Sequence, residues 1–334
     1  GAAGSAPAWH AGGQGFKSPQ LHVNSQSTAH IPRGWRIEDL YDQTGKRFLI
    51  TGGTSGLGRE TARELARCGA QVTITARSVK KAEETLNEIA SEKVDYLEMD
   101  LTDLESVRKA ARSVTGNYDA LILNAGIMAI PFAKTVDGFE TQMSTNHLGH
   151  FAFAGLIKNQ ISHRIITVSS FAHRMGSFGS GSLDEIRDIA LGKNKYSPWG
   201  AYGTSKLANL LFSFELERRA RINNWPVVAI AAHPGYSNTN LQMVSSEIRE
   251  KKSEAKITAI INKIFGQSAT NGALPTLLAA THPGLFGGLF VAPSGLMEMR
   301  GSPKLTRARE IAYDQMLATN LWSISEELTG VSWK

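Results

Sequence analysis

The chain has 334 residues, of which 42% are hydrophobic and 20% are charged, and its formal net charge is +6. These values are typical of a soluble globular protein. The Lys and Arg residues form no dense block with interleaved aromatics, so the charge indicates a solvated surface or an anionic ligand, and we expect no nucleic-acid partner. The single cysteine, Cys68, excludes an internal disulfide and a cysteine-based metal cluster, and no apolar run approaches the ~20 residues that a transmembrane helix needs.

Residues 1–30 are rich in Gly, Ala, Ser, Gln and His and contain no acidic residue. This composition is typical of a flexible segment, and also of a tag or a processed targeting sequence. We therefore expect an N-terminal extension over residues 1–36, flexible or partner-binding, and a folded domain over residues 37–334. We expect a soluble protein of the cytoplasm or of an organelle that imports it, and not a secreted one.

Residues 47–67 predict a strand, a tight turn and a helix. An apolar run leads into Thr51-Gly52-Gly53-Thr54-Ser55-Gly56-Leu57-Gly58, and a strong helix-forming stretch follows. Glycine lets the backbone bend sharply and approach a ligand, and the free N–H groups of a helix's first turn suit a pyrophosphate. The spacing fits the generic dinucleotide fingerprint only loosely, so a glycine-rich turn without a ligand is the alternative. The candidate cofactor residues here are Gly52, Thr54, Ser55, Gly56, Leu57 and Gly58.

Strands and helices alternate along the chain, which is the pattern of a parallel sheet covered on both faces. We predict an α/β fold: a single-domain, Rossmann-type, doubly wound parallel sheet with helices on both faces. Residues 171–200 are expected to form a loop over the substrate, residues 236–272 a lid or a plain pair of surface helices, and the C-terminal residues a tail. The predicted strands after the first are 71–76, 94–99, 120–123, 164–168, 227–232 and 288–293, and the predicted helices after the first are 79–90, 104–114, 139–159, 201–221 and 273–281.

Three of these strands end in residues that suit a dinucleotide. Arg77 follows the strand 71–76, where an acid binds an adenosine 2′-hydroxyl and an arginine suits a 2′-phosphate, so NADP(H) is favoured over NAD(H). Asp100 and Leu101 follow the next strand, and the carboxylate is a candidate acceptor for the adenine amino group or for a helix N-cap. Asn124, Ala125 and Gly126 follow the strand after that, where small residues allow close approach to a cofactor or form an ordinary turn.

Tyr202 and Lys206 lie four residues apart on a predicted helix, so they share one face. The pKa of an unperturbed tyrosine is about 10. An adjacent ammonium favours the phenolate, which gives a proton donor or acceptor near neutral pH. Ser170, at a strand end, is a candidate partner for a substrate carbonyl, and Asn146 is a candidate to hold a water against Lys206. Each residue has a structural alternative, because strand-end serines often cap turns and a helical asparagine is usually solvated.

Together these residues resemble the short-chain dehydrogenase/reductase family from about Gly45 to Lys334. The turn at 51–58, Asn-Ala-Gly at 124–126, Asn146, Ser170 and Tyr-x-x-x-Lys at 202–206 match the cofactor and catalytic positions of that family. Pro234, Gly235 and Thr239 match its loop on the carboxamide side of the nicotinamide. The stretches 145–151, 205–209 and 232–235 are similar to its retinol-dehydrogenase-like and protochlorophyllide-reductase-like branch. Protochlorophyllide reductases carry a cysteine where this chain has Tyr236, so light-driven chemistry is not expected.

The resemblance implies an NADP(H)-dependent oxidoreductase that interconverts an alcohol and a carbonyl. In this scheme Tyr202 exchanges a proton with the carbonyl oxygen, which Ser170 orients. Lys206 lowers the pKa of Tyr202 and holds the ribose, and Asn146 supports a proton relay. Aromatic residues in the loop 171–200 favour a lipophilic substrate such as a retinoid, a long-chain aldehyde or a steroid.

The alternative is a reductase-like, NADP(H)-binding accessory subunit with little turnover. Such a subunit would join a larger assembly, or a homo-oligomer, through the N-terminal extension. His147 and His150 are three residues apart and lack a partner that would complete a metal site, so we expect packing or surface histidines and no metal.

Overall fold

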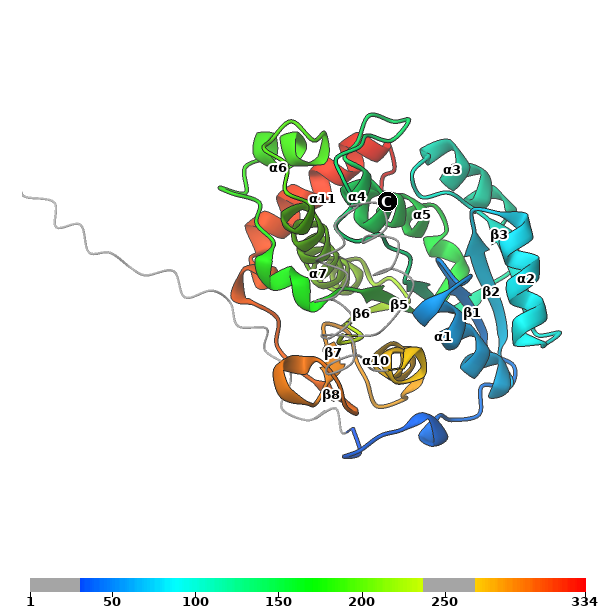
Figure 1. Ribbon diagram of the computed structural model, residues 1–334. Coiled ribbons are helices and arrows are strands. Elements are labelled where there is room, and N and C mark those ends of the chain that lie inside the picture. Colours follow the sequence, from blue (N-terminus) through cyan, green and yellow to red (C-terminus); the bar gives the residue numbers. More distant parts are fainter. Residues whose placement is uncertain (1–30, 237–267) are drawn as a thin grey trace, which may run out of the picture.

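The described residues form one sheet of eight strands in the order β3-β2-β1-β4-β5-β6-β7-β8 (Figure 1). The computed structural model describes residues 31–236 and 268–334. Neighbouring strands are parallel from β3 to β7, and β8 pairs with β7 in the antiparallel direction. The strand order reverses between β1 and β4, and doubly wound sheets bind ligands at the carboxyl ends beside such a switch point. The strands are β1 (Arg47–Ile50), β2 (Gln71–Ala76), β3 (Val94–Glu98), β4 (Tyr118–Leu123), β5 (Ile161–Val168), β6 (Val228–Ala232), β7 (Phe290–Pro293) and β8 (Pro303–Leu305).

Helices cover both faces of this sheet (Figure 1). Because successive side chains of a strand point to opposite faces, Leu49 of β1 joins one hydrophobic core while Phe48 and Ile50 join the other. A strand buried on both faces must be apolar throughout, which is why short continuous apolar runs identify these strands. One face carries α1 (Gly56–Arg67), α2 (Val79–Ile89) and α10 (Ala269–Thr281), and the other carries α3 (Leu104–Ser113), α5 (Gly149–Leu156), α7 (Pro198–Asn223) and α11 (Gln315–Thr329).

The predicted fold class and the order of elements from β1 to β7 are confirmed. The sheet differs from the prediction in one respect, because its edge strand β8 is antiparallel. Two helices begin earlier than predicted: α7 begins at Pro198, where Ser197 caps the first turn, and α10 begins after the cap Ser268. The predicted helix 139–159 is divided into α4 (Thr141–Met143), a π-helical turn (Ser144–Leu148) and α5.

Residues 171–200, expected to form a loop, contain regular structure. A 3-10 turn covers Phe171–Met175, and α6 covers Leu183–Ala190 with the Ser182 hydroxyl as its N-cap. Two helical turns are too short to give a clear apolar periodicity, so the sequence pattern did not reveal α6. Phe178, one of the aromatics expected near a substrate, is 1% exposed and packs in the core.

Residues 294–334, expected to be a tail, complete the core through β8 and α11. Trp322 and Trp333 are 2% and 5% exposed, and the Trp322 ring centroid lies 5.1 Å from that of Phe151 and 5.7 Å from that of Phe212. At the other end, Trp35 is 1% exposed and packs in the core that contains α1, so burial begins before the predicted domain start at residue 37. Residues 1–30 lie outside the described part of the chain.

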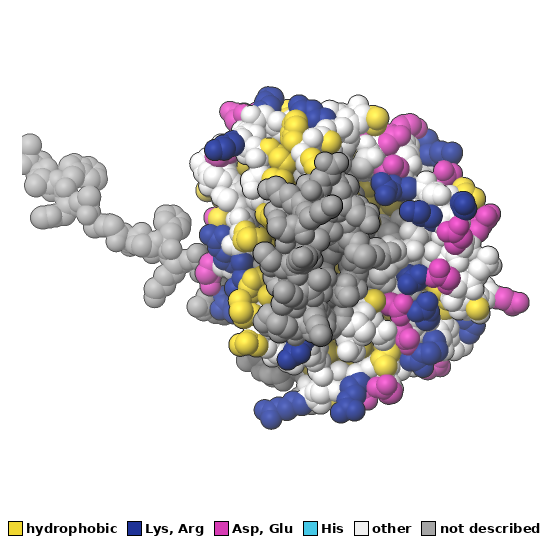
Figure 2. Space-filling model, viewed as in Figure 1, with side chains coloured by type: hydrophobic (Ala, Val, Ile, Leu, Met, Phe, Trp, Pro, Cys, Tyr) yellow, Lys and Arg dark blue, Asp and Glu magenta, His cyan; other side chains and the backbone are white. Residues whose placement is uncertain are grey.

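The predicted lid at 236–272 is described only at its ends, because residues 237–267 also lie outside the described part. Among the helices that are described, none combines the length and the apolar character that a bilayer crossing requires. On the face drawn in Figure 2, the coloured basic and acidic side chains are interspersed, so they form no large patch of one charge there.

Arg164 of β5 is buried and ties the sheet to α10. Its guanidinium donates to the carbonyl oxygens of Ala279, at 3.0 Å, and His282, at 2.8 Å, at the C-terminal end of that helix. A cation suits this end because the last carbonyls of a helix have no partner within it and carry the negative end of the dipole. Burial lowers the pKa of Arg164 to about 10, so the group stays charged at neutral pH.

His147 links the π-helical turn to α11. Its Nε2 lies 2.8 Å from the Ser325 hydroxyl, which itself donates to the Leu321 carbonyl, so the imidazole donates to the serine oxygen. Burial, followed by the nearby His150, lowers the pKa of His147 to about 3. The folded protein therefore holds this imidazole neutral, whereas the unfolded chain protonates it below about pH 6.5.

The stability contributed by a neutral His147 is fully present above pH 6.5 and is lost as the pH falls toward 3. Below pH 6.5 the free energy of unfolding of the wild type should therefore fall as the pH falls. We predict that this slope is smaller by about 1.4 kcal/mol per pH unit in His147→Gln, which keeps an N–H donor for Ser325 but does not titrate. Urea unfolding at a series of pH values measures this slope. Parallel stability curves for the variant and the wild type would show that His147 is not held neutral by the fold.

We predict that Trp322→Ala lowers the free energy of unfolding by about 3–5 kcal/mol, because it leaves a cavity among packed aromatic rings. The matched control is Met316→Ala on the same helix, where the side chain is 75% exposed and the expected change is within about 0.5 kcal/mol. Urea denaturation of both variants provides the comparison. Equal effects would mean that α11 does not hold the core together in solution.

Candidate active site

A pocket lies at the carboxyl ends of the central strands, beside the β1/β4 switch point. It brings together nearly all of the predicted cofactor residues, although they come from six separate segments of the chain. Thr239 lies outside the described residues, and Gly235, Asn146 and Ser170 stand behind or beside the lining. The predicted residues that line the pocket are Gly52, Thr54, Ser55, Gly56, Leu57, Gly58, Arg77, Asp100, Leu101, Asn124, Ala125, Gly126, Tyr202, Lys206 and Pro234.

Eight residues of the lining were not predicted, and five of them lie at a strand end or directly after it. Two more lie in the loops that follow β3 and β4, and the last lies in the π-helical turn. Strand ends meet at one edge of a parallel sheet, so the signal was present in the predicted strand boundaries. The additional residues are Thr75, Ala76, Met99, Thr102, Ile127, Thr145, Val168 and Ser169.

The glycine turn after β1 is packed so closely that only glycine fits. Gly52 has φ +68°, and a Cβ there would lie 2.8 Å from Ala125. A Cβ on Gly58 would lie 2.3 Å from the Gly52 carbonyl oxygen. The first turn of α1 therefore opens onto the pocket with bare backbone, and its N–H groups and dipole suit a pyrophosphate. This geometry fits the nicotinamide dinucleotide that the sequence analysis predicted.

A buried hydroxyl joins this turn to the one after β4. The Thr51 Oγ1 accepts from the backbone N–H groups of Asn124, at 2.9 Å, and Ala125, at 3.0 Å, and lies 2.8 Å from His150 Nε2. The other ring nitrogen, Nδ1, donates to the Asn146 carbonyl at 3.1 Å, so Nε2 is the unprotonated nitrogen and accepts from the threonine. His150 is thus a buried, hydrogen-bonded link, and not the surface residue that was one of the sequence-based expectations.

Asn146 lies in the π-helical turn, and its side chain is fully engaged with protein atoms. Its Oδ1 accepts from the Ile127 N–H at 2.8 Å, and its Nδ2 donates to the Ile127 carbonyl at 3.0 Å and to the Ser205 hydroxyl at 2.8 Å. A Cβ on Gly126 would lie 3.1 Å from Asn146 Oδ1 and 3.3 Å from Lys206 Nζ, so the two side chains flank that glycine closely. The amide therefore positions the strand-end loop against α7, and its role in a water relay stays a prediction.

Tyr202 and Lys206 lie on one face of α7 and are both about 5% exposed or less. The Lys206 Nζ is 5.9 Å from the centroid of the Tyr202 ring and donates to the Val168 carbonyl at 3.1 Å. The Ser170 side chain is hydrogen-bonded to the phenol. The three predicted groups therefore lie close together, with Tyr202 and Lys206 in the lining of the pocket and Ser170 beside it.

Burial dominates the electrostatics of this pair. It raises the pKa of Tyr202 to about 12, and the hydrogen bond with Ser170 opposes this rise. It also lowers the pKa of Lys206 to about 8. The net pKa of the phenol lies above its ordinary value, because desolvation of the buried ring outweighs any effect of the ammonium about 6 Å away. The expectation that Lys206 lowers the pKa of Tyr202 stays a prediction. At neutral pH the site holds a protonated phenol beside an ammonium.

At the opposite end of the pocket, Arg77 is exposed directly after β2. Asp100, after β3, uses Oδ1 to accept from the backbone N–H of Thr102 at 2.9 Å and from its hydroxyl at 2.7 Å. The N-cap of α3 is Asp103, so the alternative that Asp100 caps this helix is wrong. Contact of Asp100 with adenine stays a prediction. Within residues 31–236 and 268–334 there is no cluster of three or more His, Cys, Asp or Glu side chains that could hold a metal ion.

Comparison with known proteins agrees with this geometry. The family model for short chain dehydrogenases matches residues 46–182. Retinol dehydrogenase 12 of Mus musculus is 35% identical over 303 residues, which cover 87% of this chain and 88% of that protein. Polyprenol dehydrogenase of Homo sapiens is 32% identical over 321 residues, 90% of each chain. The crystal structure of an uncharacterized protein from Mycobacterium paratuberculosis has 42% identity and a TM-score of 0.76, and it covers 90% of this chain and 99% of that one.

The identity extends over nearly the full length of these relatives, so it covers the glycine turn, the strand ends and α7 together. The members of the family that they represent are oxidoreductases that act on alcohol and carbonyl groups with nicotinamide cofactors. On these grounds the chain belongs to the short-chain dehydrogenase/reductase family, in its retinol-dehydrogenase-like branch.

Proposed function

We propose that this protein is an NADP(H)-dependent oxidoreductase that interconverts an alcohol and a carbonyl on a lipophilic substrate. The observation that carries the proposal is that the Tyr202 phenol lies close to both the Ser170 hydroxyl and the Lys206 ammonium beside a glycine-lined pocket. A phenol and a hydroxyl in contact can share one carbonyl oxygen, and the bare helix terminus at the other side of the pocket suits the phosphates of a dinucleotide.

The chain supplies the proton and the orientation. A nicotinamide, when bound, exchanges the hydride with the carbonyl carbon. The Tyr202 phenol, protonated at neutral pH because burial raises its pKa to about 12, gives its proton to the carbonyl oxygen in the direction of reduction. Ser170 orients that oxygen, and the positive charge of Lys206 stabilises the phenolate that proton transfer leaves behind. Asn146 holds the loop beside Lys206 in place through Ile127 and Ser205.

Arg77 supports the choice of NADP(H). It is exposed at the carboxyl end of β2 and lines the pocket, and the α2 residues Lys80 and Lys81 are exposed close to it in the chain. No acid follows β2, where a carboxylate would favour the free 2′-hydroxyl of NAD(H). A guanidinium can instead hold the 2′-phosphate through charge-assisted hydrogen bonds.

Two observations support a lipophilic substrate. Relatives over most of the chain are named for retinol and polyprenol, which are long apolar alcohols. Trp199 is 43% exposed and its ring centroid lies 6.1 Å from that of Tyr202, so an apolar surface stands beside the proton donor. Phe178 does not contribute, since it is buried in the core.

We predict that Tyr202→Phe lowers kcat for NADPH-dependent reduction of retinal and long-chain aldehydes by about 10²- to 10⁴-fold, because it removes the proton donor. NADPH affinity should stay close to that of the wild type. The control is Tyr41→Phe, an exposed tyrosine outside the pocket, which should keep full activity. Unchanged turnover in Tyr202→Phe would refute the proposed mechanism.

We predict that Arg77→Asp weakens NADPH binding by about 10- to 100-fold and leaves NADH binding equal or stronger, because a carboxylate repels the 2′-phosphate and accepts from a free 2′-hydroxyl. Fluorescence titration with both cofactors gives the two Kd values. Arg77→Lys keeps the charge without the bidentate geometry, so its NADPH affinity should lie between the two. If Arg77→Asp binds NADPH as tightly as the wild type does, Arg77 does not select the cofactor.

A further inference from the structure

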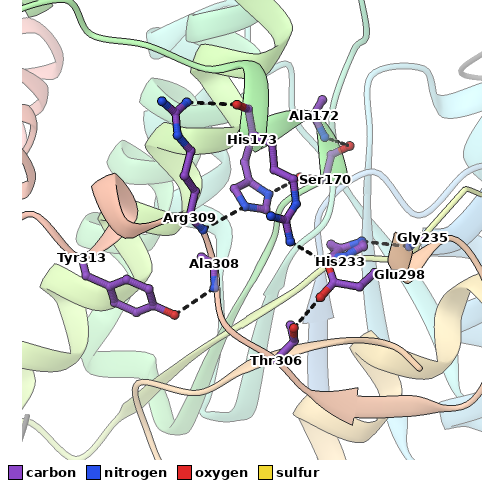
Figure 3. A network of polar contacts seen from close by, with 11 residues as sticks. Ser170, Ala172, His173, His233, Gly235, Glu298, Thr306, Ala308, Arg309 and Tyr313 are labelled. Carbon is purple, nitrogen blue, oxygen red and sulfur yellow. Dashed lines mark hydrogen bonds and ion pairs between the residues drawn. The ribbon is translucent and has the colours of Figure 1, made fainter. Parts of the chain in front are cut away.

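Glu298 joins three segments of the chain that are far apart in the sequence. Its carboxylate accepts from His233 Nε2 at 3.2 Å through Oε2 and from the Thr306 hydroxyl through Oε1 (Figure 3). Oε2 also accepts from Arg174 Nη2 at 3.4 Å. His233 follows β6, Arg174 follows β5, and Glu298 itself follows β7. The residue is 8% exposed, so these contacts lie largely inside the protein.

The hydrogen bonds around His233 determine which ring nitrogen carries the hydrogen and therefore where the ring needs an acceptor. The backbone N–H of Gly235 donates to His233 Nδ1 at 3.0 Å, so this nitrogen is unprotonated. The neutral ring then carries its hydrogen on Nε2, which points to Glu298 and needs an acceptor there. The hydrogen bond from His233 is the largest of the effects that lower the pKa of Glu298 to about 2, so the acceptor is a carboxylate at neutral pH.

The turn held in this way forms an edge of the pocket. Pro234, between His233 and Gly235, is part of the lining. Gly235 has φ +72°, and a Cβ there would lie 2.4 Å from the Met299 carbonyl oxygen, which also accepts from the Tyr236 N–H at 2.8 Å. The segment 298–299 therefore supports the turn 233–236 through both a side chain and the backbone.

The backbone at Glu298 is in a conformation that favours glycine. Met297 has φ +52° and Glu298 has φ +59°, and neither is a glycine. L-residues rarely adopt this region, and it persists where the surrounding contacts over-determine it. The partners of the carboxylate, together with the hydrogen bond at Met299, are such contacts, and they aim the Glu298 side chain inward at His233.

Strand order places this turn at one end of the cofactor. Arg77 follows β2 and Pro234 follows β6, and the two strands lie on opposite sides of the β1/β4 switch point. A dinucleotide whose adenosine phosphate meets Arg77 must therefore bring its other half toward Pro234, Tyr202 and Lys206. Under the proposed function, that half is the nicotinamide.

We propose that Glu298 is a positioning residue which, through His233, holds the Pro234–Gly235 turn in the place where it binds the nicotinamide half of the cofactor. The inference rests on the proposed function and adds to it a residue that touches neither cofactor nor substrate. Glu298 contributes the hydrogen-bond acceptor for His233, and not only stability of the fold.

The test compares NADPH with 2′-phosphoadenosine 5′-diphosphoribose, a fragment that keeps the adenosine phosphate and lacks the nicotinamide. Glu298→Ala should weaken NADPH binding by about tenfold, the equivalent of one buried hydrogen bond, and should bind the fragment as the wild type does. Glu298→Gln keeps an acceptor oxygen for His233 and should recover most of the NADPH affinity. Isothermal titration gives both Kd values, and urea denaturation monitors folding.

Two results would overturn the inference: wild-type NADPH affinity in Glu298→Ala, or equal weakening of NADPH and fragment, which is the effect of a structural defect. If Glu298→Ala does not fold, Glu298→Asp replaces it, because its shorter side chain withdraws the carboxylate from His233 while keeping the charge. Weaker NADPH binding by Glu298→Asp than by Glu298→Gln supports the role, and the reverse order refutes it. Failure of the wild type to bind either ligand would instead overturn the proposed function.

Discussion

A single buried hydroxyl group links the glycine turn to two other segments of the pocket. Thr51 Oγ1 accepts two backbone N–H groups from the turn after β4 and contacts His150, whose other ring nitrogen donates to the Asn146 carbonyl. This short chain of hydrogen bonds links the glycine turn of β1, the loop after β4 and the π-helical turn. Thr51, Asn146 and His150 are buried, so loss of a partner would leave a buried polar group without a hydrogen bond.

Burial also determines the charge state of the site. Burial raises the pKa of Tyr202 and lowers that of Lys206, because it disfavours the charged form of both groups. The two shifts have opposite consequences at neutral pH: the phenol keeps its proton, and the ammonium is brought closer to losing its own. Under the proposed function, the hydrogen bonds that hold Asn146 and Ser170 therefore matter beside charge, since they set the positions between which a proton would move.

Much of the fold and of the site was predictable from the sequence, because both depend on local patterns. Apolar runs identified the strands of a sheet that is buried on both faces, and strand ends and the Tyr202–Lys206 spacing brought the pocket residues together. The helix α6 was missed because two turns carry little periodicity, and α11 because its aromatic partners, Phe151 and Phe212, are remote in the sequence. The net rise in the pKa of Tyr202 could not be predicted, because the effect of burial cannot be judged from the spacing of two residues.

The C-terminal segment shows most clearly what motifs leave out. The candidate catalytic residues lie between Asn146 and Lys206, yet the turns that flank them rest on residues that carry no motif. His173 donates to the Ser170 carbonyl at 2.7 Å and is itself contacted by the backbone of Arg309, while Glu298 holds His233 (Figure 3). The positive φ of Glu298 persists because the partners of its carboxylate hold it, and position 235 must be a glycine because a Cβ there would lie 2.4 Å from the Met299 carbonyl oxygen. Such mutual support arises only when residues distant in the sequence pack together, and for this reason a segment expected to be a tail is a structural part of the site.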